Sequence, residues 1–67
     1  MDEAEVNRLR ELREEMESDR TEYDSKASRC DGVSFPSAAA YKMYNSMSQS
    51  LGKYIDKLDE LFPELKE

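Results

Sequence analysis

The spacing of apolar residues in the second half of the chain predicts one long helix. Apolar positions recur there in alternating steps of four and three, the period of a single helix face. That first row consists of Ala40, Tyr44, Met47, Leu51, Tyr54, Leu58, Leu61 and Leu65. A second, adjacent row is spaced by seven and consists of Tyr41, Ser48, Ile55 and Phe62. Together they predict a helix over 37–62 whose apolar face is wider than one neighbouring helix covers.

The first half of the chain carries a narrower and interrupted apolar stripe. Leu12, Asp19 and Lys26 share one heptad position, so a charged residue replaces the apolar one in the second and third heptads. We expect a helix over 2–30, with acidic residues at its start favoured by the helix dipole. Glu22 and Lys26 have the spacing of a favourable ion pair on its surface. The apolar positions of this helix are Val6, Leu9, Leu12, Met16, Tyr23, Ala27 and Cys30.

Glycine and proline mark the ends of the two predicted helices. Gly32 suits the position just after a helix, and Pro36 suits the first turn of the next, which predicts a turn over 31–36. Ser34 or Ser37 is expected to cap the second helix through its hydroxyl. Pro63 predicts that this helix ends at 62 and that 63–67 form a frayed tail.

The two stripes predict an all-α fold, a two-helix antiparallel hairpin over residues 1–67. Folding the chain at 33–34 places Tyr23 opposite Tyr44 and Asp19 near Ser48. Asp19 then either faces the seam with a polar partner or turns toward water. Gly52 is either tolerated in the helix interior or permits a close approach. The same register pairs Leu9 with Leu58, Leu12 with Ile55 and Met16 with Leu51.

The apolar face of the second helix exceeds what the first helix can cover. A domain of 67 residues has little core of its own, and short chains of this kind commonly gain stability from a partner. We therefore expect two hairpins to form a homodimer, a coiled-coil-like four-helix bundle. The expected oligomer interface consists of Met47, Leu51, Tyr54, Ile55, Leu58 and Phe62.

Composition narrows the environment and the partners of the chain. It holds 16 acidic and 10 basic residues, a net charge of −6, which argues against direct binding of nucleic acid and is compatible with a basic protein partner. No apolar stretch is long enough to span a membrane, and the acidic residues 1–5 do not resemble a secretory signal. We expect a cytoplasmic protein with no membrane partner and with Cys30 reduced.

Catalysis, metal binding and cofactor binding lack candidate residues. The chain contains no histidine, the usual general base, and one cysteine cannot form an internal disulfide or a structural zinc site. The carboxylates are interpreted as solvated helix faces. Cys30 is interpreted as a small packing residue, with a reactive thiol as the alternative. We expect no enzyme activity and no cofactor.

Protein binding is the function that the sequence favours. Tyr41, Met43 and Tyr44 suit a recognition surface near the turn, although tyrosines of a bundle core would show the same spacing. Residues 1–31 carry a net charge of −5, so an acidic helix face is expected to set partner choice. Its candidate residues are Glu14, Glu15 and Glu17.

The sequence is also compatible with two further functions. An acidic inhibitor, encoded by a phage and acting in an infected host cell, would compete with nucleic acid for a basic host protein. An oligomer that sequesters a small ligand or nucleotide would use tyrosine stacking with the cations Arg29, Lys42 and Lys53.

Overall fold

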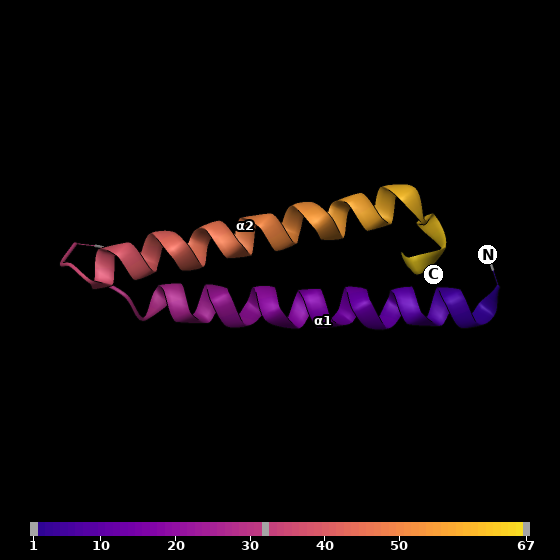
Figure 1. Cartoon of the computed structure of the whole chain (residues 1–67), viewed down its shortest axis with the longest axis horizontal. Coiled ribbons are helices and arrows are strands. Elements are labelled where there is room, and N and C mark those ends of the chain that lie inside the picture. The colour runs from indigo at the N-terminus through magenta and orange to yellow at the C-terminus, as the bar shows by residue number, and fades with distance from the viewer. Residues whose placement is uncertain (1, 32, 67) are drawn as a thin grey trace.

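The computed structural model describes residues 2–31 and 33–66, and in them two long helices form a hairpin. Helix α1 spans Glu3–Ser28, helix α2 spans Ser37–Leu61, and a 3-10 turn, η1, spans Pro63–Lys66. Figure 1 shows α1 and α2 running antiparallel along their whole length. No strand occurs in the described ranges. The prediction of an all-helical hairpin is confirmed.

The helix ends partly follow the predicted signals. Asp2 caps α1, because its carboxylate accepts a hydrogen bond from the Glu5 backbone N–H at 2.8 Å. The serine cap expected for α2 is wrong: Pro36 occupies the cap position, after a cis Phe35–Pro36 bond, and no side chain caps the helix. Ser37 is the first helical residue, and its hydroxyl accepts from the Asp31 N–H at 3.0 Å. The prediction for Gly32 lies outside the described residues.

The centre of the interface between the helices is lined by small residues. Ser48 and Gly52 of α2 are buried, together with Ile55, which is 4% exposed. On α1 the buried residue is Ala27, also 4% exposed. Ser48 and Ile55 belong to the second apolar row, so the middle of that row is buried in the hairpin, whereas Tyr41 at its start is exposed. The first row of α2, with its larger side chains, lies toward one edge of the interface.

The C-terminal segment is ordered against the hairpin, whereas the sequence predicted a frayed tail. Phe62 is the C-cap residue that follows α2, and η1 then turns back toward α1 (Figure 1). Arg10 Nη2 donates a hydrogen bond to the Glu64 carbonyl at 3.0 Å, and Leu65 is only 6% exposed. Burial of Leu65 compensates for the conformational entropy that a frayed tail would keep.

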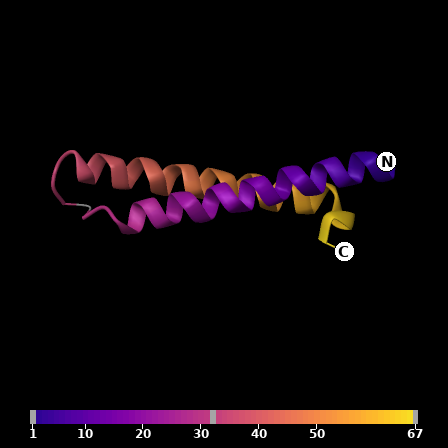
Figure 2. The same ribbon diagram turned by 90° about the horizontal axis from the view of Figure 1, so that it is seen from below.

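The hairpin is elongated and exposes more surface than a typical folded protein of the same mass. Its Cα extents are 50 × 16 × 14 Å, and α1 crosses over α2 when seen from the side (Figure 2). The radius of gyration is 14.9 Å, against about 11 Å for a typical domain of this length. The accessible area is 5072 Å², against about 4,400 Å² for a typical folded monomer of 7.8 kDa. The chain therefore exposes about 700 Å² of additional surface.

Candidate protein-interaction site

An open apolar hollow lies where the N-terminal half of α1 meets the C-terminal half of α2. Its volume is about 270 Å³. Side chains from both helices form its walls, and Lys57 is the one charged residue among them. The residues that line it are Leu12, Met16, Tyr54, Lys57, Leu58 and Leu61.

A second hollow continues toward the turn. It has a volume of about 290 Å³, and Asp19 is the charged residue in its wall. The residues that line it are Asp19, Tyr23, Ser46, Met47, Ser50 and Leu51. The α1 residues of the two hollows, 12, 16, 19 and 23, follow one another in steps of four, three and four, so they share one helix face. We call these twelve residues the apolar groove.

Large apolar side chains of the groove remain open to solvent. Tyr54 is 59% exposed, Leu61 58%, Leu12 45% and Met47 39%. Single exposed apolar residues are common on protein surfaces, but a contiguous set on one face marks a contact surface. The groove is therefore the strongest candidate site in the described part of the chain.

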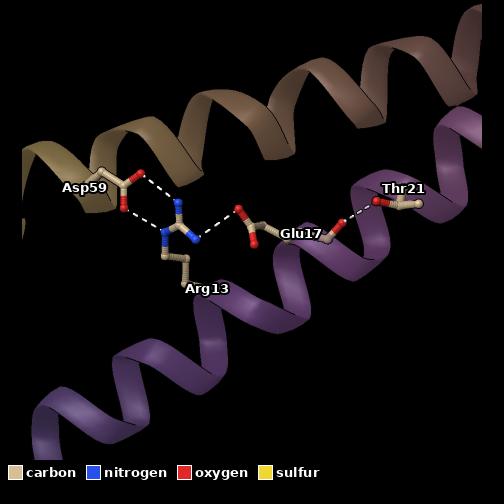
Figure 3. Close-up of polar contacts among 4 residues, drawn as sticks. All are labelled: Arg13, Glu17, Thr21 and Asp59. Carbon is tan, nitrogen blue, oxygen red and sulfur yellow. Dashed lines mark hydrogen bonds and ion pairs between the residues drawn. The ribbon is translucent and has the colours of Figure 1, made fainter. Parts of the chain in front are cut away.

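The other side of the interface is polar. Arg13 of α1 donates two hydrogen bonds to the Asp59 carboxylate of α2, from Nε at 2.7 Å and from Nη2 at 2.9 Å (Figure 3). Its Nη1 also lies 2.9 Å from Glu17 Oε1, one turn along α1. The hydrogen bonds with Asp59 are the main reason that the pKa of Arg13 is raised. This two-pronged geometry fixes the register of the helices.

Two further polar contacts extend this side toward the turn. The buried Ser48 hydroxyl donates a hydrogen bond to Asp24 Oδ1. The guanidinium of Arg20 lies across Gly52, at a distance where a Cβ atom would be 3.0 Å from Arg20 Cζ. Gly52 therefore leaves room for a side chain of α1, whereas a close approach of the two helices, one of the two alternatives from sequence, stays a prediction. Asp19 is half-buried in the groove, on the side of the interface opposite Asp24, whose carboxylate accepts from Ser48.

The tyrosines near the turn are divided between stacking and exposure. Tyr44 stacks on Tyr23, with ring centroids 6.1 Å apart, as the predicted register requires. Lys26 Nζ lies 5.7 Å from the Tyr23 centroid and 5.8 Å from that of Tyr44. Tyr41 is 41% exposed and Met43 51% exposed. The structure therefore does not bring Tyr41, Met43 and Tyr44 into a common hollow.

The acidic candidates lie on the solvent side of α1. Glu14, Glu15 and Glu17 are all exposed. Glu17 pairs with Arg13, and the predicted Glu22–Lys26 pair is present at 3.2 Å. No ion pair involves Glu14 or Glu15 within residues 2–31 and 33–66. These two carboxylates are open to an external partner.

The residues expected at an oligomer interface occupy different environments. Met47, Leu51, Tyr54 and Leu58 line the groove, and Phe62 is half-buried beside η1. Ile55 is only 4% exposed in the single chain, so it presents little surface to a second copy. Its place at an oligomer interface stays a prediction.

Several groove residues were not among the sequence candidates. The apolar periodicity places Leu12, Met16 and Leu61 in the stripes that hold the hairpin together, and it does not mark Lys57. The available signal was the width of the α2 face, since residues at one margin of a wide face must lie outside a two-helix seam. Which margin is left open depends on helix rotation.

The described residues of the turn and the Cys30 thiol add no second candidate site. The Asp31 carboxylate accepts hydrogen bonds from the Val33 and Ser34 N–H groups, each at 3.0 Å, which lowers the pKa of Asp31. The half-buried Cys30 Sγ donates to the Lys26 carbonyl. Across the described ranges, no three potential metal-ligating side chains converge. No described helix has the length and apolar character to cross a membrane.

Comparison with known proteins adds no family. The sequence matches no protein-family model, and neither a curated protein nor a solved structure is significantly similar to the chain.

Proposed function

We propose that this chain is a non-enzymatic protein-interaction module and that the apolar groove is its binding surface. The observation that carries the proposal is the exposure of Tyr54, Leu61 and Leu12 along one side of a hairpin with a very small core. Apolar groups of this size release ordered hydration when another protein covers them. In a groove formed by two helices, further helices pack most readily.

Self-association is the first form of binding that this surface supports. Two hairpins that cover each other's grooves would form a four-helix bundle, in which both apolar rows of α2 are buried. The excess of about 700 Å² in exposed area is close to the roughly 800 Å² that one partner buries in a standard interface. In this assembly Tyr41, Met43 and the acidic face of α1 remain available to a different protein, which the module would block or scaffold.

Sedimentation equilibrium over a range of micromolar concentrations tests the proposal. We expect a dimer for the parent chain and a monomer for Tyr54→Ser combined with Leu61→Ser. Phe35→Ser is the matched control, because Phe35 is 86% exposed in the turn, outside the groove. Equal helical content by circular dichroism separates a lost interface from a lost fold. A parent chain that stays monomeric at high micromolar concentration would contradict self-association.

A second candidate function follows from the open carboxylates of Glu14 and Glu15. They lie on a helix-bearing segment with a net charge of −5 and could occupy the nucleic-acid site of a basic protein. A protein captured from a cell lysate should then be released by duplex DNA and by added salt. Glu14→Lys with Glu15→Lys should abolish capture, whereas Tyr41→Ser should leave it intact. Capture that resists salt and DNA would reject this function.

A further inference from the structure

The apolar groove carries one charge in each half, and the two charges have opposite sign. Lys57 lies in the hollow near the chain termini, and Asp19 lies in the hollow nearer the turn. All other residues lining the groove are uncharged. The two hollows are also similar in volume, about 270 and 290 Å³. The groove therefore consists of two hollows of similar volume that carry opposite charges.

We infer that a second copy of this chain occupies the groove in head-to-tail orientation, with Asp19 of each copy against Lys57 of the other. This inference rests on the proposed function, since it specifies the partner of the same surface. A two-fold axis perpendicular to the hairpin places residue i against j and j against i. The dimer then contains two Asp19–Lys57 pairs, and each charge is neutralised once. The alternative axis along the hairpin would place Asp19 against Asp19 and Lys57 against Lys57.

The same axis also matches the apolar residues. It passes near Met16 and Tyr54, between the two charged positions, so each copy's hollow near the turn covers the other's hollow near the termini. Tyr23 and Met47 of one copy then lie over Leu12 and Leu61 of the other. Leucine and methionine side chains on one surface thus pack against tyrosine and methionine on the other, as in the core of an antiparallel bundle.

The length of the groove suits a second copy of the chain. Its lining residues on α2 run from Ser46 to Leu61, which is about 22 Å of helix at 1.5 Å per residue. A short peptide would cover only one hollow and leave the opposite charge of the other hollow without a counterpart. A second copy covers both hollows with a surface that is already complementary.

Charge reversal tests the proposed contact. Asp19→Lys or Lys57→Asp alone creates two repulsive pairs per dimer, and we expect the dissociation constant to rise by about tenfold or more. An equimolar mixture of the two variants restores opposite charges at both contacts, so a heterodimer of parental affinity should form. The double variant should dimerise as the parent does. Glu11→Lys is the control for Asp19→Lys, because it changes the net charge by the same amount at an exposed position outside the groove, and it should dimerise as the parent does.

The single cysteine allows the orientation to be measured in the parent sequence. Cys30 lies fourteen residues beyond Met16, so at 1.5 Å per residue a nitroxide on Cys30 is about 20 Å from the axis. Double electron–electron resonance should give a distance of about 40 Å between the two nitroxides of a head-to-tail dimer. The parallel arrangement brings the two turns together and gives a much shorter separation. Sedimentation of the labelled chain confirms that the label leaves the dimer intact.

The outcomes separate this inference from the function on which it rests. A long separation, together with rescue in the mixture, supports the head-to-tail dimer. A parent dimer with a short separation, or with an affinity unaffected by either single reversal, overturns the inference and leaves the interaction module standing. A monomeric parent overturns both.

Discussion

The two sides of the interface between α1 and α2 have opposite chemistry. On one side, Arg13 with Asp59 and Ser48 with Asp24 make directional contacts that are satisfied within one chain. On the other side lies the apolar groove, whose exposed side chains make no such contacts. Hydrogen bonds specify distance and angle, whereas apolar contact specifies little beyond shape. The polar side therefore sets the register of the hairpin, and the apolar side provides surface for a partner.

The comparison also explains why so few residues are buried. Ser48 and Gly52 are buried at the interface, and Gly52 leaves room for the Arg20 guanidinium of α1 to lie across α2. Rotation of α2 toward this side leaves its first apolar row at the margin. The interface thus gives up apolar burial in exchange for fixed polar contacts, and the groove is the consequence.

The largest expected effect is at Ile55, which lies between the two sides. Ile55→Ala removes a side chain that is 4% exposed and should lower the free energy of unfolding by about 2–4 kcal/mol. Because Ile55 packs inside one chain, the loss measured by urea denaturation should be the same at low and high protein concentration. Leu61→Ala is the comparison from the groove, and its loss should grow with concentration. If the stability losses of Ile55→Ala and Leu61→Ala depended on protein concentration in the same way, the distinction between core and groove would be wrong.

The next effect concerns the Arg13–Asp59 pair on the polar side. Arg13→Met removes two charge-assisted hydrogen bonds to a carboxylate whose side chain is 10% exposed, and we expect a loss of about 2 kcal/mol in thermal or urea unfolding. Arg13→Met combined with Asp59→Leu should recover most of that loss, because an apolar pair fits the same place. A double variant as unstable as the single one would show that the ion pair contributes net stability that an apolar pair does not replace.

A smaller and opposite effect is expected at Gly52. Alanine favours a helix interior over glycine by about 1 kcal/mol, but its Cβ would lie 3.0 Å from Arg20 Cζ. Arg20 is an exposed, flexible side chain and can shift by a few tenths of an ångström. Gly52→Ala should therefore raise the melting temperature, with a gain below about 1 kcal/mol. Adding Arg20→Ala should restore the full gain, and a net loss would show that the backbones are in tight contact.

The smallest effect is expected at Asp31, in the turn that joins both sides. Its pKa lies below the ordinary value of 3.8, because the carboxylate accepts hydrogen bonds from the Val33 and Ser34 N–H groups. Its stabilising contribution is complete above pH 3.8 and is lost as the pH falls through the lower value of the folded state. Asp31→Asn should flatten that part of the acid-unfolding curve. An unchanged curve would exclude a role for the carboxylate.

The helices, their approximate ends and their antiparallel pairing followed from local sequence alone. Apolar periodicity, acidic residues at the start of α1 and the proline and glycine of the turn are local signals, each read within a few residues. The Tyr23–Tyr44 stack followed from the predicted register, and the Glu22–Lys26 pair followed from helical spacing. The same register placed Asp19 near Ser48, which is wrong, because Ser48 donates to Asp24.

Only the tertiary structure decided how each helix is rotated about its axis. That rotation directed Ser48, Gly52 and Ile55 toward α1 and left Tyr54 and Leu61 exposed. It also paired Ser48 with Asp24, turned Asp19 into the groove and folded Leu65 back onto the hairpin. Two adjacent apolar rows on α2 are compatible with more than one rotation. The choice depends on contacts between residues far apart in the chain, above all the geometry of Arg13 and Asp59, which no local pattern records.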